Sequence, residues 1–161
     1  MDAVLRKHGF KLAAAAIISI ILPFYLSTAA LSESNNAPQI NRTVPLGTCK
    51  KDVLKIMGKP DSPIDFDFSY KRGGCEILVT FDDKTGMVSA VIVIGRNPAY
   101  SVSGLTVGSS RSEVKRIFGV PEKTHKYLKG GSECWLYPSK KVNFCIKGDK
   151  VASFSVSDTK Y

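Results

Sequence analysis

Hydrophobic and polar residues alternate in two stretches of the chain, and each stretch follows a short helical pattern. In the helical patterns, residues 46–61 and 107–122, apolar side chains recur at i, i+3 and i+4. The alternating segments that follow are residues 65–70, 77–81 and 87–94 in the first stretch and 133–137, 142–146 and 151–156 in the second. The sequence therefore predicts short helices packed on antiparallel strands.

Both helical patterns carry signals for their ends. Thr48 or Ser109 supplies an N-cap oxygen, and Ser110 with Glu113 also fits a capping box. A glycine that can adopt a left-handed conformation follows the last turn of each pattern, and a proline two residues later prevents continuation. A helix of about two turns is too short to be stable alone, so its apolar face must pack on the strands.

The two stretches also resemble each other at a constant offset of 61 residues, without a gap. Identical pairs are Gly47/Gly108, Val53/Val114, Ile56/Ile117, Gly58/Gly119 and Pro60/Pro121. Such internal similarity is typical of a repeated unit. We therefore predict an α+β fold of two tandem repeats, residues 44–98 and 105–161, joined by a linker over residues 99–104. Each repeat would be a short helical segment packed on an antiparallel β-sheet of about three to four strands.

The alternation also assigns the two faces of the predicted sheets. The apolar positions, expected to form the core under the helices, are Phe68, Tyr70, Val79, Phe81, Trp135, Tyr137, Val142 and Phe144. The opposite positions are more polar and are expected to be solvated, as one face of an antiparallel sheet can be; they are Asp67, Ser69, Thr80, Leu136, Asn143, Ser153 and Ser155.

The N-terminal residues 1–32 have the pattern of a secretory signal peptide. Arg6, Lys7 and Lys11 precede a charge-free run that continues to Glu33. Cleavage after Ala29, Ala30 or Ser32 fits equally, and an uncleaved signal anchor is the alternative. No cysteine precedes Cys49, so the pattern does not predict a lipoprotein.

Residues 33–43 are polar and aperiodic and are predicted to form a flexible tether. They contain a glycosylation acceptor sequence at Asn41, which matters only in a host that glycosylates such sites. Removing residues 1–32 would lower the net charge from +9 to +7, because that segment holds three basic residues and one acid. We expect a periplasmic or secreted protein.

Four cysteines in an exported chain indicate two disulfides. A hairpin closed around Ser139 and Lys140 places Cys134 opposite Cys145, within reach of a disulfide. The remaining pair is Cys49, at the start of the first helix, with Cys75 beneath it. A zinc site is disfavoured because no Cys-x-x-Cys spacing occurs, and free thiols are expected only in a reducing compartment.

Few residues offer catalytic chemistry. His125 lies in a lysine-rich stretch, where a solvated loop or edge position explains it, and Asp82 and Asp83 lead into a turn at Gly86. We expect no enzymatic activity, no metal and no cofactor.

A basic contact surface could be formed by residues on the outer faces of the two helices, namely Lys50, Lys51, Lys55, Arg111, Lys115 and Arg116. The simpler interpretation is that these side chains keep the protein soluble. Export argues against a nucleic-acid partner, and membrane contact is expected only through the signal segment if it is uncleaved.

The helix motif Leu-Gly-Thr-x-x-x-Asp-Val-x-x-x-x-Gly-x-Pro, followed by an aromatic strand and an apolar strand ending in Phe-Asp-Asp, resembles the SmpA/OmlA (BamE-like) domain. It also resembles the tandem fold of the beta-lactamase inhibitory proteins. The resemblance implies helices on one side of an antiparallel sheet and a non-catalytic protein-binding role in the cell envelope, as a scaffold or assembly adaptor. The alternatives are a secreted inhibitor of a hydrolase such as a beta-lactamase, or a protein that binds polyanions or membrane surfaces.

Overall fold

The computed structural model describes residues 40, 42–64, 67–127 and 131–158. The predicted signal peptide, most of the predicted tether and Asn41 lie outside the described residues. The described elements are α1 (Lys50–Met57), β1 (Ser62–Ile64), β2 (Asp67–Arg72), β3 (Cys75–Phe81), β4 (Val88–Ile94), α2 (Arg111–Phe118), β5 (Lys123–Tyr127), β6 (Ser132–Tyr137), the 3₁₀ turn η1 (Pro138–Lys140), β7 (Val142–Lys147) and β8 (Lys150–Ser157).

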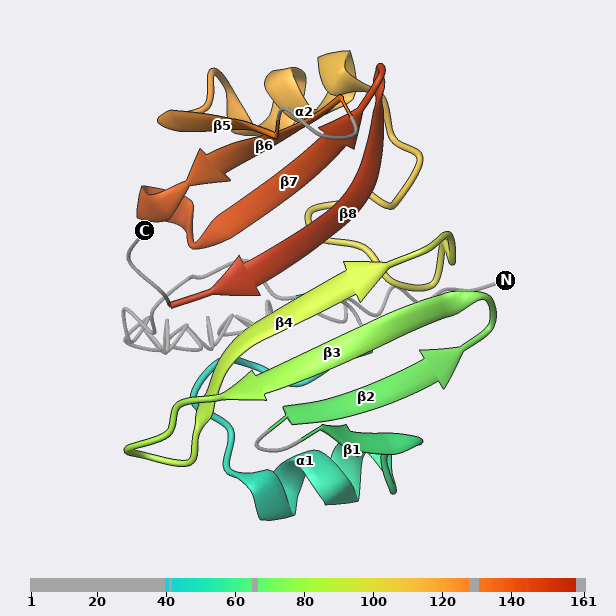
Figure 1. Cartoon of the computed structure of the whole chain (residues 1–161), viewed down its shortest axis with the longest axis vertical. Coiled ribbons are helices and arrows are strands. Elements are labelled where there is room, and N and C mark those ends of the chain that lie inside the picture. The colour runs from blue at the N-terminus through green and yellow to red at the C-terminus, as the bar shows by residue number, and fades with distance from the viewer. Residues whose placement is uncertain (1–39, 41, 65–66, 128–130, 159–161) are drawn as a thin grey trace, which may run out of the picture. The chain divides into compact units, whose positions relative to one another are not determined.

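All eight strands belong to one antiparallel sheet, in the order β1-β2-β3-β4-β8-β7-β6-β5. The prediction of an α+β fold with two tandem helix-on-sheet repeats is therefore wrong: the described part of the chain is mostly β, with two short helices on a single sheet. The sheet is continuous because β4 pairs with β8, with Val91 opposite Val156 and Val93 opposite Phe154. Figure 1 shows these two strands side by side, joining β1–β3 to β5–β7.

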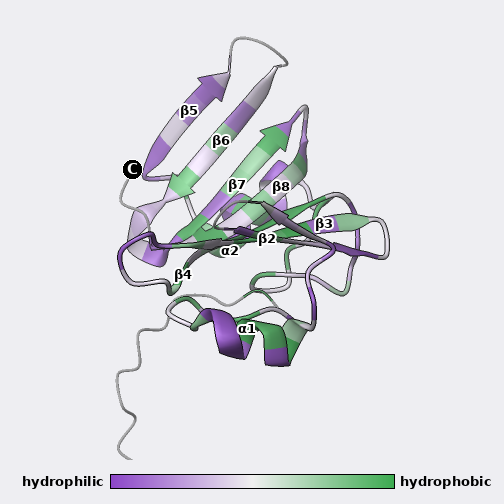
Figure 2. Cartoon of the chain, turned by 60° about the horizontal axis from the view of Figure 1, so that its bottom comes forward, coloured by the Kyte–Doolittle hydropathy of each residue, from purple (hydrophilic) through white to green (hydrophobic). Residues whose placement is uncertain are grey.

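The strand interiors follow the predicted alternation. Strand β3 alternates buried and half-buried residues along its whole length, and β6 and β7 bury Trp135, Tyr137, Val142 and Phe144. Figure 2 shows residues of differing hydropathy in succession along β6 and β7. The strands β1 and β5, which the sequence does not predict, lie at the two edges of the sheet.

The two helices start differently. Ser110 caps α2 with a complete capping box, because its hydroxyl accepts from the Glu113 amide while the Glu113 carboxylate accepts from the Ser110 amide. The cap of α1 is Cys49, which makes no side-chain cap hydrogen bond. The prediction that Thr48 or Ser109 caps a helix is wrong, since the Thr48 hydroxyl donates to the Pro45 carbonyl instead.

Both helices pack on the same face of the sheet, and their last turns are attached to it by tyrosines. The Tyr70 hydroxyl donates to the carbonyl of Gly58 at 3.2 Å, and the Tyr137 hydroxyl donates to the carbonyl of Gly119 at 3.0 Å. Both glycines have a positive φ, as expected for residues that end a helix. Phe118 of α2 lies 5.1 Å from the Phe144 ring, which places the core between the helices and the sheet.

Two segments that the sequence presents as connections contribute to this core. Ile40 and Thr43, at the end of the predicted tether, are buried, as are Tyr100 and Val102 in the predicted linker. Val102 and Leu105 exchange backbone hydrogen bonds of 2.9 Å, which closes a tight turn before α2. In the described residues, no helix combines the length and the hydropathy needed to cross a bilayer.

Candidate binding site on the open face

The face of the sheet opposite the helices, here called the open face, contains a pocket of about 430 Å³. The pocket extends from the edge strand β5 across β6 and β7 to β8 and β4. Its lining residues are Ile92, His125, Tyr127, Cys134, Leu136, Asn143, Cys145, Ser153, Phe154 and Ser155. We call this the open-face pocket.

Strand register explains why these side chains meet, except that of Phe154, which pairs with Phe144 on the helix face of the sheet. Side chains of directly paired residues point to the same face of a sheet. His125 pairs with Cys134, Cys134 with Cys145, and Cys145 with Ser153, so these residues form one row across four strands. The disulfide between Cys134 and Cys145 therefore lies in the middle of the row, with His125 at one end.

The neighbouring row is more apolar at one end and polar at the other. Leu136 pairs with Asn143, and Asn143 pairs with Ser155. The Asn143 amide donates to the hydroxyls of Ser155 and Ser157, both at 3.3 Å, so its polar group is satisfied although the residue is buried. This bonding also fixes the orientation of the amide in the pocket wall.

Two rings mark the outer rim of the pocket on β5. Tyr127 is 51% exposed, and its ring meets that of His125 edge to face, with centroids 4.8 Å apart. Exposed aromatic rings next to a hydrophobic depression are typical of binding surfaces. The arrangement can accommodate an apolar group against Leu136 and the disulfide while His125, Tyr127 and Asn143 offer hydrogen bonds.

The described residues that line the pocket include one imidazole, that of His125, and no carboxylate or lysine. Within the described part of the chain, no cluster of three or more His, Cys, Asp or Glu side chains could hold a metal ion.

The cysteines form one disulfide. Cys134 and Cys145 are bonded, as the predicted hairpin register requires. The predicted Cys49–Cys75 disulfide is wrong, because both cysteines are free thiols. Cys75 begins β3, whereas Cys49 pairs with Met87 beyond the other end of that strand. About six residues at roughly 3.3 Å each separate them, or about 20 Å, far beyond disulfide reach.

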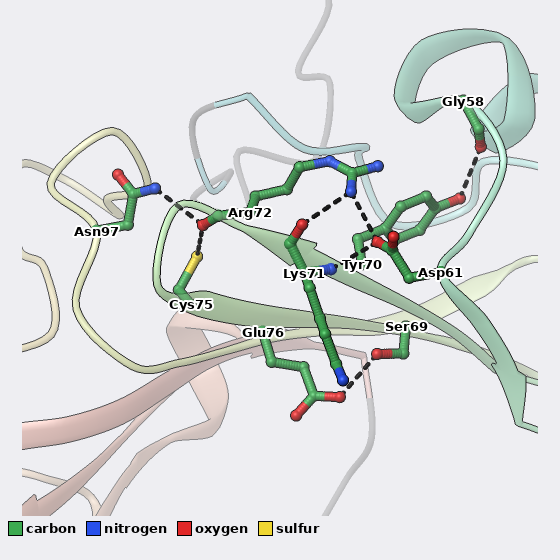
Figure 3. A network of polar contacts seen from close by, with 9 residues as sticks. All are labelled: Gly58, Asp61, Ser69, Tyr70, Lys71, Arg72, Cys75, Glu76 and Asn97. Carbon is green, nitrogen blue, oxygen red and sulfur yellow. Dashed lines mark hydrogen bonds and ion pairs between the residues drawn. The ribbon is translucent and has the colours of Figure 1, made fainter.

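Cys75 belongs instead to a polar network at the β2–β3 hairpin, shown in Figure 3. Its thiol donates to the carbonyl of Arg72 at 3.0 Å, and the Asn97 amide donates to the same oxygen at 3.0 Å. Burial raises the pKa of the Cys75 thiol, which keeps it protonated and unreactive. On the outer side of the hairpin, the Asp61 carboxylate accepts from the Lys71 amide and the Arg72 guanidinium, and these bonds lower its pKa.

The predicted basic contact surface does not form one patch. Its residues divide between α1, whose Lys50 lies over the rings of Phe68 and Phe81, and α2, whose Phe118 packs against Phe144. On α1, Lys50 lies 4.9 Å from the Phe81 ring and Lys55 forms an ion pair with Asp52 at 2.7 Å, while Lys51 is exposed.

On α2, two of the predicted basic residues cover a buried tryptophan. Arg111 lies 5.0 Å and Lys115 5.3 Å from the Trp135 ring, and Arg111 also pairs with Glu133 at 3.0 Å. Arg116 is exposed on the outer side of the helix. Arg111 and Lys115 therefore contribute to packing, which the sequence pattern did not indicate.

The adjacent carboxylates Asp82 and Asp83 lie in the turn after β3. One Asp82 oxygen accepts from the amides of Lys84 and Thr85 and from the Thr85 hydroxyl, and the bonds to Thr85 lower the pKa of Asp82 most. This is a turn-stabilising role, as the sequence predicts, and no bond in this turn prepares the pair for proton transfer.

Comparisons with known proteins identify a fold but not a family. No protein-family model matches the sequence, and no curated protein sequence matches it. The structure is similar to that of YjgB, a DUF4309 family protein from Bacillus subtilis, with a TM-score of 0.52 and 14% identity over 69% of this chain and 78% of that one.

Two further solved structures are more distant. One is an extracellular protein containing an SCP domain from Bacillus anthracis, with a TM-score of 0.45 and 12% identity over 70% of this chain and 44% of that one. The other is a cysteine-rich secretory protein from Staphylococcus aureus, with a TM-score of 0.46 and 14% identity over 73% and 49%. The chain thus spans less than half the length of each.

These findings correct the resemblance inferred from the helix motif. The solved structure that matches with a TM-score of 0.52 is a DUF4309 family protein, which is neither an SmpA/OmlA (BamE-like) domain nor a beta-lactamase inhibitory protein, and no family model matches the chain. The motif consists of a helix start, an apolar helix face and a Gly-x-Pro stop, features that are common in short helices packed on sheets. It therefore reports local structure and does not identify a family.

Proposed function

We propose that this chain is an exported, non-catalytic binding module that holds a protein partner on the open face of its sheet. The observation that carries the proposal is the open-face pocket of about 430 Å³, which has an apolar floor and polar groups at fixed positions. Concave sites of this kind, apolar with a few oriented hydrogen-bonding groups, are typical of ligand recognition.

Export is supported by two independent features. The first 32 residues have the basic, apolar and small-residue segments of a signal peptide. The Cys134–Cys145 disulfide lies beside the pocket, and disulfides of this kind persist in oxidising compartments outside the cytosol.

A binding role without catalysis is supported by the chemistry of the lining. His125 meets Tyr127 and the disulfide row, and no described carboxylate faces it in the pocket. A protein partner is favoured over a small ligand because the apolar surface continues beyond the pocket to the exposed Ile94 on β4, while the Tyr127 ring on the pocket rim is also exposed.

The test is site-specific photo-crosslinking in cells that produce the full chain. The photoreactive residue p-benzoylphenylalanine replaces Ser155 in the pocket, and in a control it replaces Lys51 on the outer side of α1. We expect a discrete protein adduct from the pocket position alone. The same adduct from both positions, or none from the pocket, would overturn the proposal.

Two blocking variants complete this experiment. Leu136→Arg introduces a charge into the pocket floor, and Ser153→Trp fills the pocket without changing the charge. Both should abolish the adduct from position 155 while the thermal unfolding curve stays cooperative. A turnover that depends on His125 would show that the site is catalytic.

A further inference from the structure

The two edges of the sheet differ in the backbone groups that they present. Strand β1 has three residues, and Pro63 at its centre has no amide hydrogen. Strand β5 has five residues, none of them proline, and all five are exposed. Figure 2 shows β5 as a hydrophilic strand at the margin of the sheet.

The direction of the backbone groups of β5 follows from the disulfide on the neighbouring strand. The Cα atoms of Cys134 and Cys145 are 4.1 Å apart, a spacing typical of a non-hydrogen-bonded pair. The amide and carbonyl of Cys134 therefore point away from β7 and toward β5, where its partner is His125. Since the direction alternates along a strand, the amides and carbonyls of Thr124 and Lys126 point outward, away from the sheet.

The position of Pro63 in β1 matches that of Thr124 in β5. Pro63 follows Ser62, which pairs with Ser69, and Thr124 follows Lys123, which pairs with Leu136. At both edges the residue before the strand donates its amide hydrogen to the carbonyl of the residue that pairs with the first residue of the strand. Asp61 donates to Ser69 at 2.9 Å, and Glu122 donates to Leu136 at 3.1 Å. Proline thus removes from β1 the outward amide that β5 keeps.

The charge of this edge selects among strands that could pair with it. Lys123 and Lys126 belong to β5. Glu133 of β6 stands opposite Lys126 in the sheet but forms its ion pair with Arg111, so the strand remains basic. A second copy would bring its own lysines against these, and like charges on paired strands are unfavourable. An acidic strand meets no such repulsion.

We propose that β5 accepts an extended, acidic segment of a partner protein as an additional strand of the sheet. The outward amides and carbonyls of Thr124 and Lys126 would bond to it, and its side chains on the open face would lie next to His125 and Tyr127, at the rim of the pocket. The inference rests on the proposed function and names the chemistry of the partner.

The test titrates the mature chain with a defined probe, an acetylated and amidated heptapeptide of alternating glutamate and valine. The same peptide with lysine in place of glutamate is the control. We expect only the acidic peptide to bind in NMR titrations, and hydrogen exchange should slow at the Thr124 and Lys126 amides but not at the His125 amide. Equal binding of both peptides, no binding at millimolar concentration, or protection at other amides would overturn the proposal.

Matched variants separate backbone from side-chain effects. Thr124→Pro copies the arrangement of Pro63 and should weaken peptide binding at least tenfold, whereas Thr124→Val keeps the amide and should bind like the wild type. Lys126→Glu should weaken binding of the acidic peptide and improve binding of the basic one. If Thr124→Pro fails to fold, the exchange measurement on the wild-type chain still decides the matter.

Two outcomes distinguish this inference from the function on which it rests. If the crosslinked adduct of the pocket survives Thr124→Pro but is lost in Leu136→Arg, the pocket function stands and the added strand is refuted. If the protein doubles in size without peptide, and Thr124→Pro abolishes the doubling, the occupant of β5 is a second copy and the acidic partner is refuted.

Discussion

A reductant changes a single bond in this protein, because Cys134 and Cys145 form a disulfide while Cys49 and Cys75 are free thiols. The bond closes a loop with a sequence separation of 11. For a loop of that length, the loss of entropy in the unfolded chain is roughly 9 cal/mol/K, which corresponds to about 2.8 kcal/mol at 25 °C. Reduction should therefore lower the free energy of unfolding by about 2–3 kcal/mol.

The assay is guanidinium unfolding of the oxidised and reduced protein, followed by the fluorescence of Trp135, the one tryptophan in the chain. Trp135 is 2% exposed and follows Cys134 in β6, so unfolding transfers its ring from the core to solvent. The denaturant dependence should rise on reduction, since the opened loop exposes more surface in the unfolded state. The midpoint of thermal unfolding should fall by roughly 10 °C.

A double variant with Cys134→Ala and Cys145→Ala serves as the control, because its stability should not respond to reductant. A response of this variant would reveal a second disulfide and refute the assignment of Cys49 and Cys75 as free thiols. A loss below about 1 kcal/mol in the wild type would refute the loop-entropy reasoning, since it would show that the β6–β7 hairpin keeps its structure in the unfolded chain.

Three further predictions concern single side chains. Cys49→Ser should raise the free energy of unfolding, measured with urea, by about 0.5–1 kcal/mol, because the N-cap of α1 then gains a hydroxyl acceptor. Unchanged stability would show that this hydroxyl does not reach the amides of the first helical turn. Burial raises the pKa of Tyr137 to about 12, so the wild type should lose stability as the pH rises from about 10 toward 12. Tyr137→Phe should reduce this loss, and the part that remains is expected from Tyr70, whose pKa burial also raises. The variant should also cost about 1 kcal/mol at pH 7 through the lost bond to Gly119, and equal pH profiles of variant and wild type would contradict the assignment. The hydrogen bond from the Trp135 indole N–H, followed by that from the Arg111 guanidinium, lowers the pKa of Glu133. The stability that Glu133 contributes is therefore present above its unfolded pKa of about 4.3 and is lost as the pH falls through the lower folded value. Glu133→Gln should reduce the loss of stability at acidic pH, and an unchanged loss would refute the bonding of Glu133 to Trp135 and Arg111.

The elements of the fold are predictable where the information is local. The six strands with alternating apolar residues and both helices form where the pattern places them, and the hairpin around Ser139 sets the register that bonds Cys134 to Cys145. The pairing of β4 with β8 joins residues that are far apart in the sequence, such as Val91 and Val156, and no turn signal connects them. Alternation cannot indicate which strand edge meets which, so the single sheet was not predictable from the pattern.

The edge strands and the pocket escaped prediction for a related reason. The sequence of β5, Lys-Thr-His-Lys-Tyr, contains no buried residue, so no hydrophobic period marks it as a strand. Leu136, Asn143 and Ser155 are assigned correctly to the polar face, but their conversion into a pocket depends on β5 lying beside β6. The spacing of His125 and Tyr127, two residues apart and therefore on one face of any strand that contains them, was the available signal.

The same dependence on position along a strand explains the incorrect disulfide. Parity places Cys75 correctly on the buried side of β3, but parity does not report the distance along the strand. Cys49 belongs to the end where β4 begins, because it pairs with Met87, whereas Cys75 lies near Ile94 at the other end. The face of the sheet on which a cysteine lies and its position along the strand are independent, and the prediction of a disulfide needs both.

The basic side chains of the protein act in two ways that the net charge does not distinguish. Arg111 and Lys115 flank the Trp135 ring, and Lys50 lies over Phe81, so part of the basic side chains stabilises the packing of the helices through cation–π contacts. A polyanion laid across the helices would have to compete with these contacts and would meet two separate groups of cations. At β5 the situation differs, because Lys126 stands next to outward backbone groups that no described strand uses. Charge is therefore expected to discriminate between partners at this edge, where backbone hydrogen bonds supply the affinity.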